Sequence, residues 1–87
     1  MAQVFIPSMM RHLTGGETQV YMEGRTLHEL LQNLEERFPG FREMVLQEGD
    51  FRPDVAIAVD GEVALDLTER VGDTSEVHFI PPIAGGV

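Results

Sequence analysis

The sequence predicts an α+β fold in which a mixed β-sheet carries one main helix on one face. A strongly amphipathic segment, with leucines at helical spacing, lies between short segments that alternate polar and apolar residues. A helix that covers one face of a sheet is an economical way to bury such a leucine stripe. The 87 residues suit one domain with a modest core. We expect residues 1–82 to form this domain and residues 83–87 to form a flexible C-terminal tail.

The N-terminal part of the chain predicts a β-hairpin. The stretch AQVFIP alternates polar and apolar residues and ends at Pro7, as an edge or ending strand does. The stretch TQVYMEG alternates again, with Val20 and Met22 on one face and Tyr21 on the other. A Gly-Gly turn signal lies between the two stretches, so we expect them to pair as a hairpin.

The clearest predicted element is a helix that starts at Thr26. Thr26 and Glu29 form a capping-box pattern, in which each side chain satisfies a backbone donor at the helix start. The helix is expected to end before Pro39, because proline disfavours helical geometry in the preceding residue. Residues 35–37 are expected to face water. The apolar stripe consists of Leu27, Leu30, Leu31, Leu34 and Phe38.

The second half of the chain predicts a short helix and three strands. FREMVLQEG is interpreted as the helix, with Phe41, Met44 and Val45 on its apolar side. DVAIAVDGEVALD predicts a strand, a tight Asp60-Gly61 turn and a short returning strand. LTERVGDTSE is interpreted as connecting chain and EVHFIPPI as the last strand. The expected order is therefore β-β-α-β-β-β, with the short helix added.

Alternation gives each predicted strand a core face and an outer face. Phe5, Tyr21, His78 and Ile80 are expected together on the face opposite the helix, where an exposed apolar patch would suit a protein partner. A register shift of one residue would reverse this assignment. The residues expected to point to the core are Val55, Ile57, Val59, Val77 and Phe79, opposite Ala56 and Ala58.

Composition argues against several kinds of site and partner. The chain contains no cysteine, which excludes disulfides, thiolate metal sites and thiol nucleophiles. Its net charge of −9 would repel phosphate backbones, so we expect no nucleic-acid partner and favour a protein partner with a basic surface. No apolar run approaches the roughly 20 residues of a membrane span, and no secretory signal is visible. We therefore expect a cytoplasmic location and no membrane partner.

No catalytic or metal-binding pattern is visible in the sequence. His12, His28 and His78 are too scattered to propose a metal site. Glu35 and Glu36 are interpreted as a solvated helix face, because paired carboxylates for acid–base catalysis need a cleft. The Gly-Gly turn has no lysine after it and is not interpreted as a phosphate cradle. We expect no bound cofactor, no metal and no catalytic residue.

The C-terminal stretch FIPPIAGGV is the candidate working part of the chain. Pro81 and Pro82 stiffen the exit from the sheet. The glycines carry no side chain, so this stretch can thread a narrow active site. From Ile83 to Gly86 an extended chain reaches about 13 Å at roughly 3.3 Å per residue, which is enough to enter a partner's pocket.

Nearly the whole chain resembles the ubiquitin-like sulfur carriers of the MoaD and ThiS type, which have the β-grasp fold. LTGGETQVYMEGRTLHELLQNLEERFPGF resembles the family's hairpin and helix, FRPDVAIAVDGE its middle strand and turn, and EVHFIPPIAGG its last strand and tail. The PPIAGG ending is the feature that makes this resemblance specific. It leans toward molybdopterin-synthase small subunits, although carriers that serve cysteine, thiamine and other products share the scaffold.

The resemblance implies a carrier protein and not an enzyme. An E1-like enzyme of the MoeB or ThiF type would use ATP to adenylate the carboxylate of Gly86, and a sulfur donor would convert it to a thiocarboxylate. A sulfur-accepting synthase would then use this sulfur to make a cofactor, cysteine or another product. Because the chain has no thiol, a terminal carboxyl is the plausible place to carry sulfur. The tail residues implied are Ile83, Ala84, Gly85 and Gly86.

The sequence departs from the family pattern in two places. Val87 follows Gly86, whereas the family usually ends on the second glycine. Resemblance to carriers with residues beyond the Gly-Gly implies removal of Val87 by a zinc-dependent protease of the JAMM class. The alternatives are that Val87 is a genomic accident without a role or that the activating enzyme tolerates it. GDTSE replaces the common Gly-Asp-Glu before the last strand, and we interpret this as a loop variation of little consequence.

Two other functions stay open on the sequence alone. A ubiquitin-like modifier would join its activated Gly86 to lysines of target proteins. The chain has no lysine of its own, so it could not build lysine-linked polymers of itself. A passive β-grasp binding module would carry the Gly-Gly ending incidentally.

Overall fold

The computed structural model describes residues 1–80 of the chain. In chain order the elements are β1 (Ala2–Phe5), the 3₁₀ helix η1 (Ser8–Leu13), β2 (Gln19–Met22), α1 (Leu27–Arg37), α2 (Phe41–Val45), β3 (Leu46–Gln47), β4 (Asp50–Phe51), β5 (Ala56–Val59), β6 (Glu62–Val63) and β7 (Glu76–Ile80).

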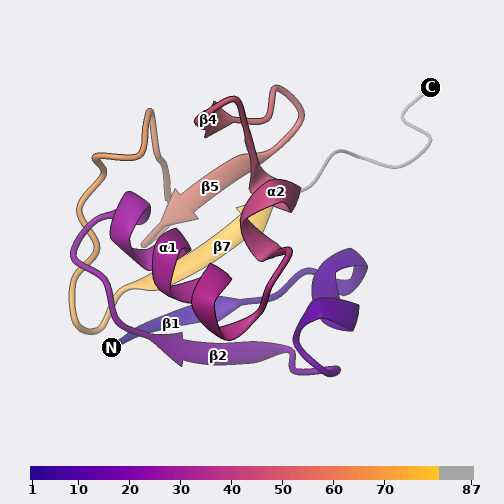
Figure 1. Cartoon of the computed structure of the whole chain (residues 1–87). Coiled ribbons are helices and arrows are strands. Elements are labelled where there is room, and N and C mark those ends of the chain that lie inside the picture. The colour runs from indigo at the N-terminus through magenta and orange to yellow at the C-terminus, as the bar shows by residue number, and fades with distance from the viewer. Residues whose placement is uncertain (81–87) are drawn as a thin grey trace.

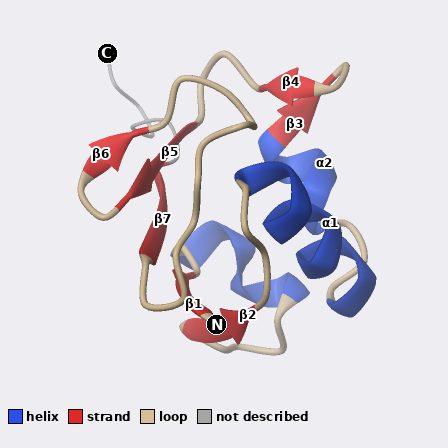
Figure 2. Cartoon of the chain, turned by 90° about the vertical axis from the view of Figure 1, so that its left-hand side faces the viewer, coloured by secondary structure: helices blue, strands red, loops and turns tan. Residues whose placement is uncertain are grey.

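Five strands form one mixed sheet in the order β2-β1-β7-β5-β6, and β3 pairs with β4 in a separate small hairpin. The neighbours β1 and β7 run parallel, whereas the other pairs in the large sheet are antiparallel. The helices α1 and α2 lie on one side of this sheet, as Figure 1 and Figure 2 show. The predicted α+β fold, with one main helix on one face of a mixed sheet, is confirmed.

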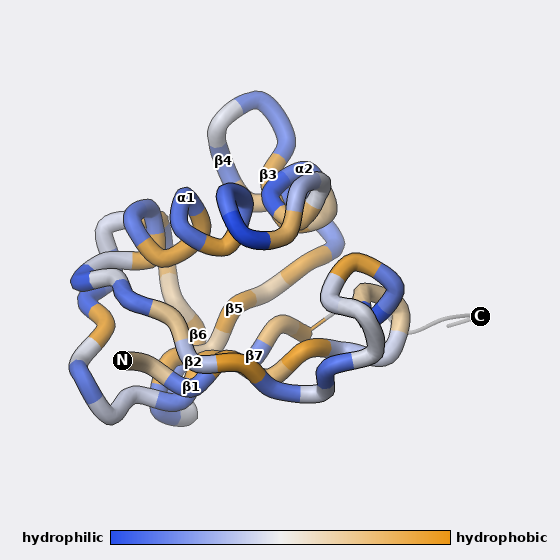
Figure 3. The backbone as a smooth tube through the Cα atoms, turned by 60° about the horizontal axis from the view of Figure 1, so that its bottom comes forward, coloured by the Kyte–Doolittle hydropathy of each residue, from blue (hydrophilic) through white to orange (hydrophobic). Residues whose placement is uncertain are grey.

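The hydrophobic core lies between α1 and the sheet. The four leucines Leu27, Leu30, Leu31 and Leu34 are fully buried, and Phe38 is half-buried against them. The apolar side of the helix faces the strands (Figure 3). The sheet contributes alternate residues of its strands, which include Val4, Val20, Met22, Ile57, Val59, Val77 and Phe79. The predicted core face of each strand is therefore correct, except that Val55 is only half-buried just before β5.

The start of α1 is held by its own cap and by a distant loop. The Thr26 hydroxyl accepts a hydrogen bond from the N–H of Glu29 (3.2 Å), which is one half of the predicted capping box. The N–H groups of the first two helical residues donate to the carbonyls of Glu69 and Leu67 (both 3.0 Å), in the loop between β6 and β7. Since these donors have no partner inside a helix, the contacts tie the long loop to α1.

The predicted N-terminal hairpin is confirmed, but its connection is a folded segment. Between β1 and β2 the chain forms η1, in which Met10 is buried. The Arg11 side chain donates through Nε to the carbonyl of Ile6 (3.1 Å), and the Thr14 hydroxyl lies 2.9 Å from the carbonyl of Glu17. Six residues are too few for a periodic signal in the sequence, so η1 was not predicted.

The predicted second helix exists and is shorter than expected. In α2 the side chains of Phe41 and Val45 are buried and that of Met44 is half-buried. The helix ends at Val45 because β3 begins directly after it. The residues Glu48 and Gly49, both with positive φ, turn the chain into β4, and this small hairpin was not predicted.

Glu35 is half-buried and hydrogen-bonded, so its interpretation as a purely solvated side chain was wrong. Its carboxylate accepts hydrogen bonds from the N–H groups of Gly40 (3.0 Å) and Arg42 (2.8 Å), so it joins α1 to the start of α2. These backbone hydrogen bonds favour the ionised form and lower the pKa of Glu35 below its ordinary value. The neighbouring Glu36 is exposed, as predicted.

The loop before β7 is more than a neutral variation, which corrects a second prediction. The hydroxyl of the buried Ser75 donates to Asp60 Oδ2 (2.8 Å) and accepts from the N–H of Gly72 (2.8 Å). Asp60 also accepts from the N–H of Glu76 (2.9 Å). The hydrogen bond from the Glu76 N–H, which has the larger effect, and that from the Ser75 hydroxyl both lower the pKa of Asp60 below its ordinary value. The predicted Asp60-Gly61 turn, in which both residues have positive φ, is thereby tied to the start of β7.

The buried leucine stripe yields a stability prediction. We expect Leu30→Ala and Leu34→Ala each to lower the free energy of unfolding by about 2–5 kcal/mol, because each change leaves a cavity in the core. Urea unfolding measures the loss. Leu65→Ala is the matched control, because Leu65 is exposed. Losses below about 0.5 kcal/mol at both stripe positions would contradict the described core.

The hydrogen bonds that link Glu35 to the start of α2 yield a prediction about how stability depends on pH. Since the folded-state pKa of Glu35 lies below its ordinary value of 4.5, the ionised carboxylate stabilises the fold above that pH. This contribution is lost as the pH falls below 4.5 and through the folded-state pKa. We therefore expect the stability difference between the parent chain and Glu35→Gln to be largest near neutral pH and to shrink in acid. Glu36→Gln should show no such trend, and a difference for Glu35→Gln that stayed constant with pH would refute the link.

Candidate functional site

The strand that leads to the C-terminal tail lies in the middle of the sheet. β7 pairs with β1 on one side and with β5 on the other, and its last residue, Ile80, lies opposite Ala56. The β1 ladder ends at His78, so Phe79 and Ile80, the last described residues, are paired with β5 alone. Outside the described residues lie the predicted domain boundary after residue 82 and the predicted site residues Ile83, Ala84, Gly85, Gly86 and Val87.

The four predicted surface residues share the face of the sheet opposite α1. Phe5, His78 and Ile80 are neighbours there, whereas Tyr21 lies apart from them, opposite Gln3. The inward residues of β7 belong to the core, so His78 and Ile80 point outward. Phe5 and Tyr21 alternate in the same way with buried residues of β1 and β2. Tyr21 is 56% exposed and Ile80 is 46% exposed. We call these four residues the outer face.

The strand register brings two members of the outer face into contact. Phe5 and His78 lie opposite each other in the parallel β1–β7 ladder, and their rings stack with centroids 4.2 Å apart and planes 4° from parallel. Nε2 of His78 lies 3.7 Å from Oε1 of Glu76. The stack gives the outer face a flat apolar centre with a polar edge, the combination found at many protein interfaces.

The sequence analysis missed the extension of the outer face toward β6. Ala58 lies opposite His78, and Val63 lies opposite Ala58 on the edge strand, where it is exposed. The signal for this pairing was present in the sequence. A two-residue Asp60-Gly61 turn fixes the register of its flanking strands, and that register places Val63 on the outer side.

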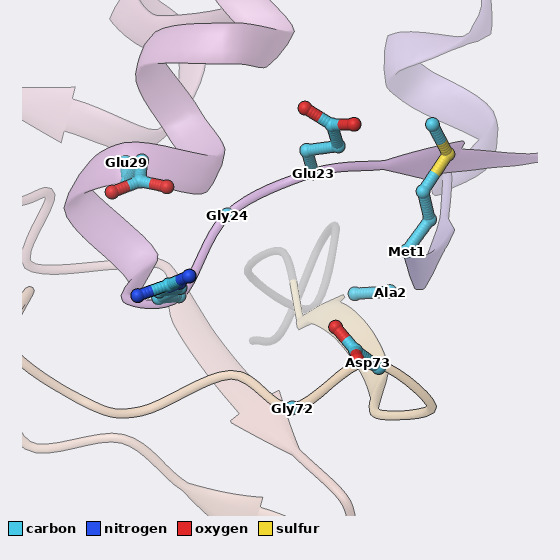
Figure 4. Close-up of a pocket in the computed structure, with 8 residues that line it drawn as sticks. Met1, Ala2, Glu23, Gly24, Glu29, Gly72 and Asp73 are labelled. Carbon is cyan, nitrogen blue, oxygen red and sulfur yellow. The ribbon is translucent and has the colours of Figure 1, made fainter.

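A polar pocket in the described part of the chain is lined by carboxylates. It has a volume of about 540 Å³ and lies at the end of the sheet where β1 and β7 begin. Figure 4 shows the carboxylates of Glu23, Glu29 and Asp73 around it, and no serine, histidine or other nucleophile lines it. Within residues 1–80, no group of histidine or carboxylate side chains is placed to hold a metal ion. Over the same range, no helix is long and apolar enough to cross a membrane.

Comparison with known proteins gives matches over nearly the whole chain. The profile of the ThiS family matches residues 4–86. The sulfur carrier protein CysO of Mycobacterium tuberculosis is 30% identical, over 95% of this chain and 96% of that protein. A chain of the BexX/CysO complex of Amycolatopsis orientalis superposes with a TM-score of 0.94 at 28% identity, over 99% of this chain and 100% of that one. The crystal structure of CysO from Mycobacterium tuberculosis gives a TM-score of 0.90 at 27% identity, over 95% and 100% of the two chains. The predicted β-grasp fold is confirmed.

The exposure of the outer face yields a prediction about binding. Ile80→Asp adds a charge where a partner would have to remove water, so we expect it to weaken binding of the expected E1-like enzyme by about tenfold or more. The free energy of unfolding should change by less than about 0.5 kcal/mol, because Ile80 lies outside the core. Thr74→Asp, in the exposed loop before β7, is the control. Unchanged affinity, measured by calorimetry, would remove Ile80 from the interface.

Proposed function

The chain belongs to the ThiS family, and from that premise we propose that it is a sulfur carrier protein, itself a substrate and not an enzyme. The extent of the family match supports this most directly. The match runs through the C-terminal stretch to Gly86 and leaves Val87 outside it. The relatives covered over nearly their whole length bear the name sulfur carrier.

The proposed reacting group is the carboxylate of Gly86. Because a carboxylate is a poor electrophile, an E1-like enzyme of the MoeB or ThiF type first activates it: the carboxylate oxygen attacks the α-phosphorus of ATP, and pyrophosphate leaves. Hydrosulfide (HS⁻) delivered by a sulfur donor then attacks the carbonyl carbon, AMP leaves with its oxygen, and loss of the S–H proton gives the thiocarboxylate. ATP is bound by the partner enzyme, so this chain needs no cofactor of its own. The cytoplasm, the location expected from the sequence, supplies ATP.

The thiocarboxylate is proposed to pass its sulfur to a sulfur-accepting synthase, which makes a cofactor, cysteine or another sulfur-containing metabolite. The outer face suits the docking of such partners because the exposed Ile80 ends β7 and the Phe5–His78 stack lies next to it, whereas Tyr21 lies toward the start of β7. A partner held there is close to the tail that it must receive.

We further propose that Val87 is removed before activation. Val87 carries a β-branched side chain and moves the carboxylate one residue beyond Gly86. A zinc-dependent protease of the JAMM class suits this cut, because a metal-bound water is a nucleophile at neutral pH and the ion polarises the carbonyl. Val87 would then be a cap that keeps the chain inert until it is trimmed.

The test compares adenylation of residues 1–87 with that of a chain ending at Gly86, using the E1-like enzyme of the same organism. We expect pyrophosphate release only with the chain that ends at Gly86. After a sulfur donor is added, its intact mass should rise by the difference between one sulfur and one oxygen. A chain ending at Gly85 is the matched control and should not react.

Two outcomes of this test contradict separate parts of the proposal. Equal adenylation of both chains, with Val87 still attached to the product, would remove the cap and leave the carrier function intact. Failure to adenylate either chain would contradict the carrier function itself. Adducts with lysines of other proteins, formed in place of a thiocarboxylate, would favour the modifier.

A further inference from the structure

A second apolar surface lies at the end of β7, on the side of the sheet that carries the helices. It is a groove of about 290 Å³ between η1, α2, the segment before β5 and β7. Three of the chain's five methionines line it. The residues that line this surface, which we call the methionine groove, are Met9, Met10, Met44, Arg52, Asp54, Val55 and Phe79.

The residues that line the groove are of the kinds found at protein docking sites. Its floor is apolar, and Arg52 and Asp54 are the charged residues among those that line it. Arg52 is held in place because its Nε donates to the carbonyl of Glu43 (2.9 Å) and its Nη1 donates to Oε1 of Gln47 (3.4 Å). An apolar floor with charged residues beside it is typical of protein interfaces. Methionine side chains are flexible and polarisable, so they adapt to the shape of an inserted side chain.

The position of the groove indicates what covers it. Phe79 lines the groove and its ring packs edge-to-face on Phe41 of α2 (centroids 5.4 Å apart), while the next residue, Ile80, points to the outer face. From Ile80 to Gly86 the chain spans at most about 20 Å at roughly 3.3 Å per residue. An enzyme that holds Gly86 in its active site must therefore approach this end of β7, where both surfaces lie.

We propose that the methionine groove is a second docking surface, which takes an apolar side chain of the E1-like activating enzyme. This inference rests on the proposed carrier function. The enzyme would then hold the end of β7 from both sides, with the outer face on one side and the groove on the other. Contacts on both sides fix the direction of the tail better than contact with one face.

Methionine oxidation tests the groove directly. Met9 is 49% exposed in the groove, and Met1 is 61% exposed at the start of β1. Because β1 and β7 are parallel, Met1 lies at the opposite end of the sheet and is the internal control. We expect hydrogen peroxide to oxidise Met9 and Met44 about tenfold more slowly when the chain ending at Gly86 is bound to the activating enzyme, with Met1 unchanged. Mass spectrometry of proteolytic peptides gives each rate.

Substitution provides a second measurement. Met9→Asp puts a charge into the groove and should raise the KM for adenylation by about tenfold, whereas Thr74→Asp, in the exposed loop before β7, should leave it unchanged. Circular dichroism and urea unfolding show whether Met9→Asp is folded; if it is not, the oxidation rates decide alone.

The other outcomes overturn the inference. If Met9 and Met44 are oxidised equally fast with and without the bound enzyme, and the enzyme still adenylates Gly86, the groove is not a docking surface, but the carrier function stands. Equal protection of Met1 would show that the effect is not local. If Met9 and Met44 are oxidised more slowly than Met1 even without the enzyme, something in the carrier itself covers the groove. A slowing that increases with protein concentration would assign the groove to a second copy of the chain, and one that does not would assign it to the chain's own tail. Absence of any adenylation would instead refute the proposed function.

Discussion

The central position of β7 is the constraint on which the rest of the structure depends. This strand is hydrogen-bonded to a parallel neighbour, β1, and to an antiparallel neighbour, β5. Its inward side chains, Val77 and Phe79, are buried against the leucine stripe of α1 and the aromatic ring of Phe41. β7 cannot shift as a whole without breaking both ladders and opening the core, although its last two residues pair with β5 alone. The fold therefore fixes the position of Ile80, the last residue that the structure describes.

In this account the reacting group and the surfaces that partners recognise lie in different parts of the chain. The proposed reacting group is a backbone carboxyl. Within residues 1–80 no group of histidine or carboxylate side chains is placed to hold a metal ion, and neither serine nor histidine lines the polar pocket. The surfaces near the end of β7 are therefore the candidates for recognition by partners. The stack of Phe5 on His78 with Ile80 on one side, and the methionine groove on the other, are the surfaces placed there.

The parts of the fold and the site that could be predicted from the sequence are those that leave a pattern within a few neighbouring residues. The leucine stripe, the Thr26 cap, the Asp60-Gly61 turn and the alternation of His78 and Ile80 with core residues are patterns within a few residues, and each was correct. Contacts that join separate elements leave no such pattern. Glu35 and Ser75 look like ordinary surface residues in the sequence, and only the folded chain brings Glu35 to the start of α2 and Ser75 to Asp60. The methionine groove is assembled from four segments, so no stretch of sequence indicated it.

The mass of the protein isolated from its own cells tests the central claim most directly. If the chain is a carrier that is trimmed and charged at Gly86, intact-mass spectrometry will find a species without Val87, part of which carries one sulfur in place of one oxygen. Fragmentation will place that sulfur at the C-terminal glycine. A population that is uniformly full-length and free of sulfur in cells that are making sulfur-containing metabolites, or one joined to lysines of other proteins, would contradict the account.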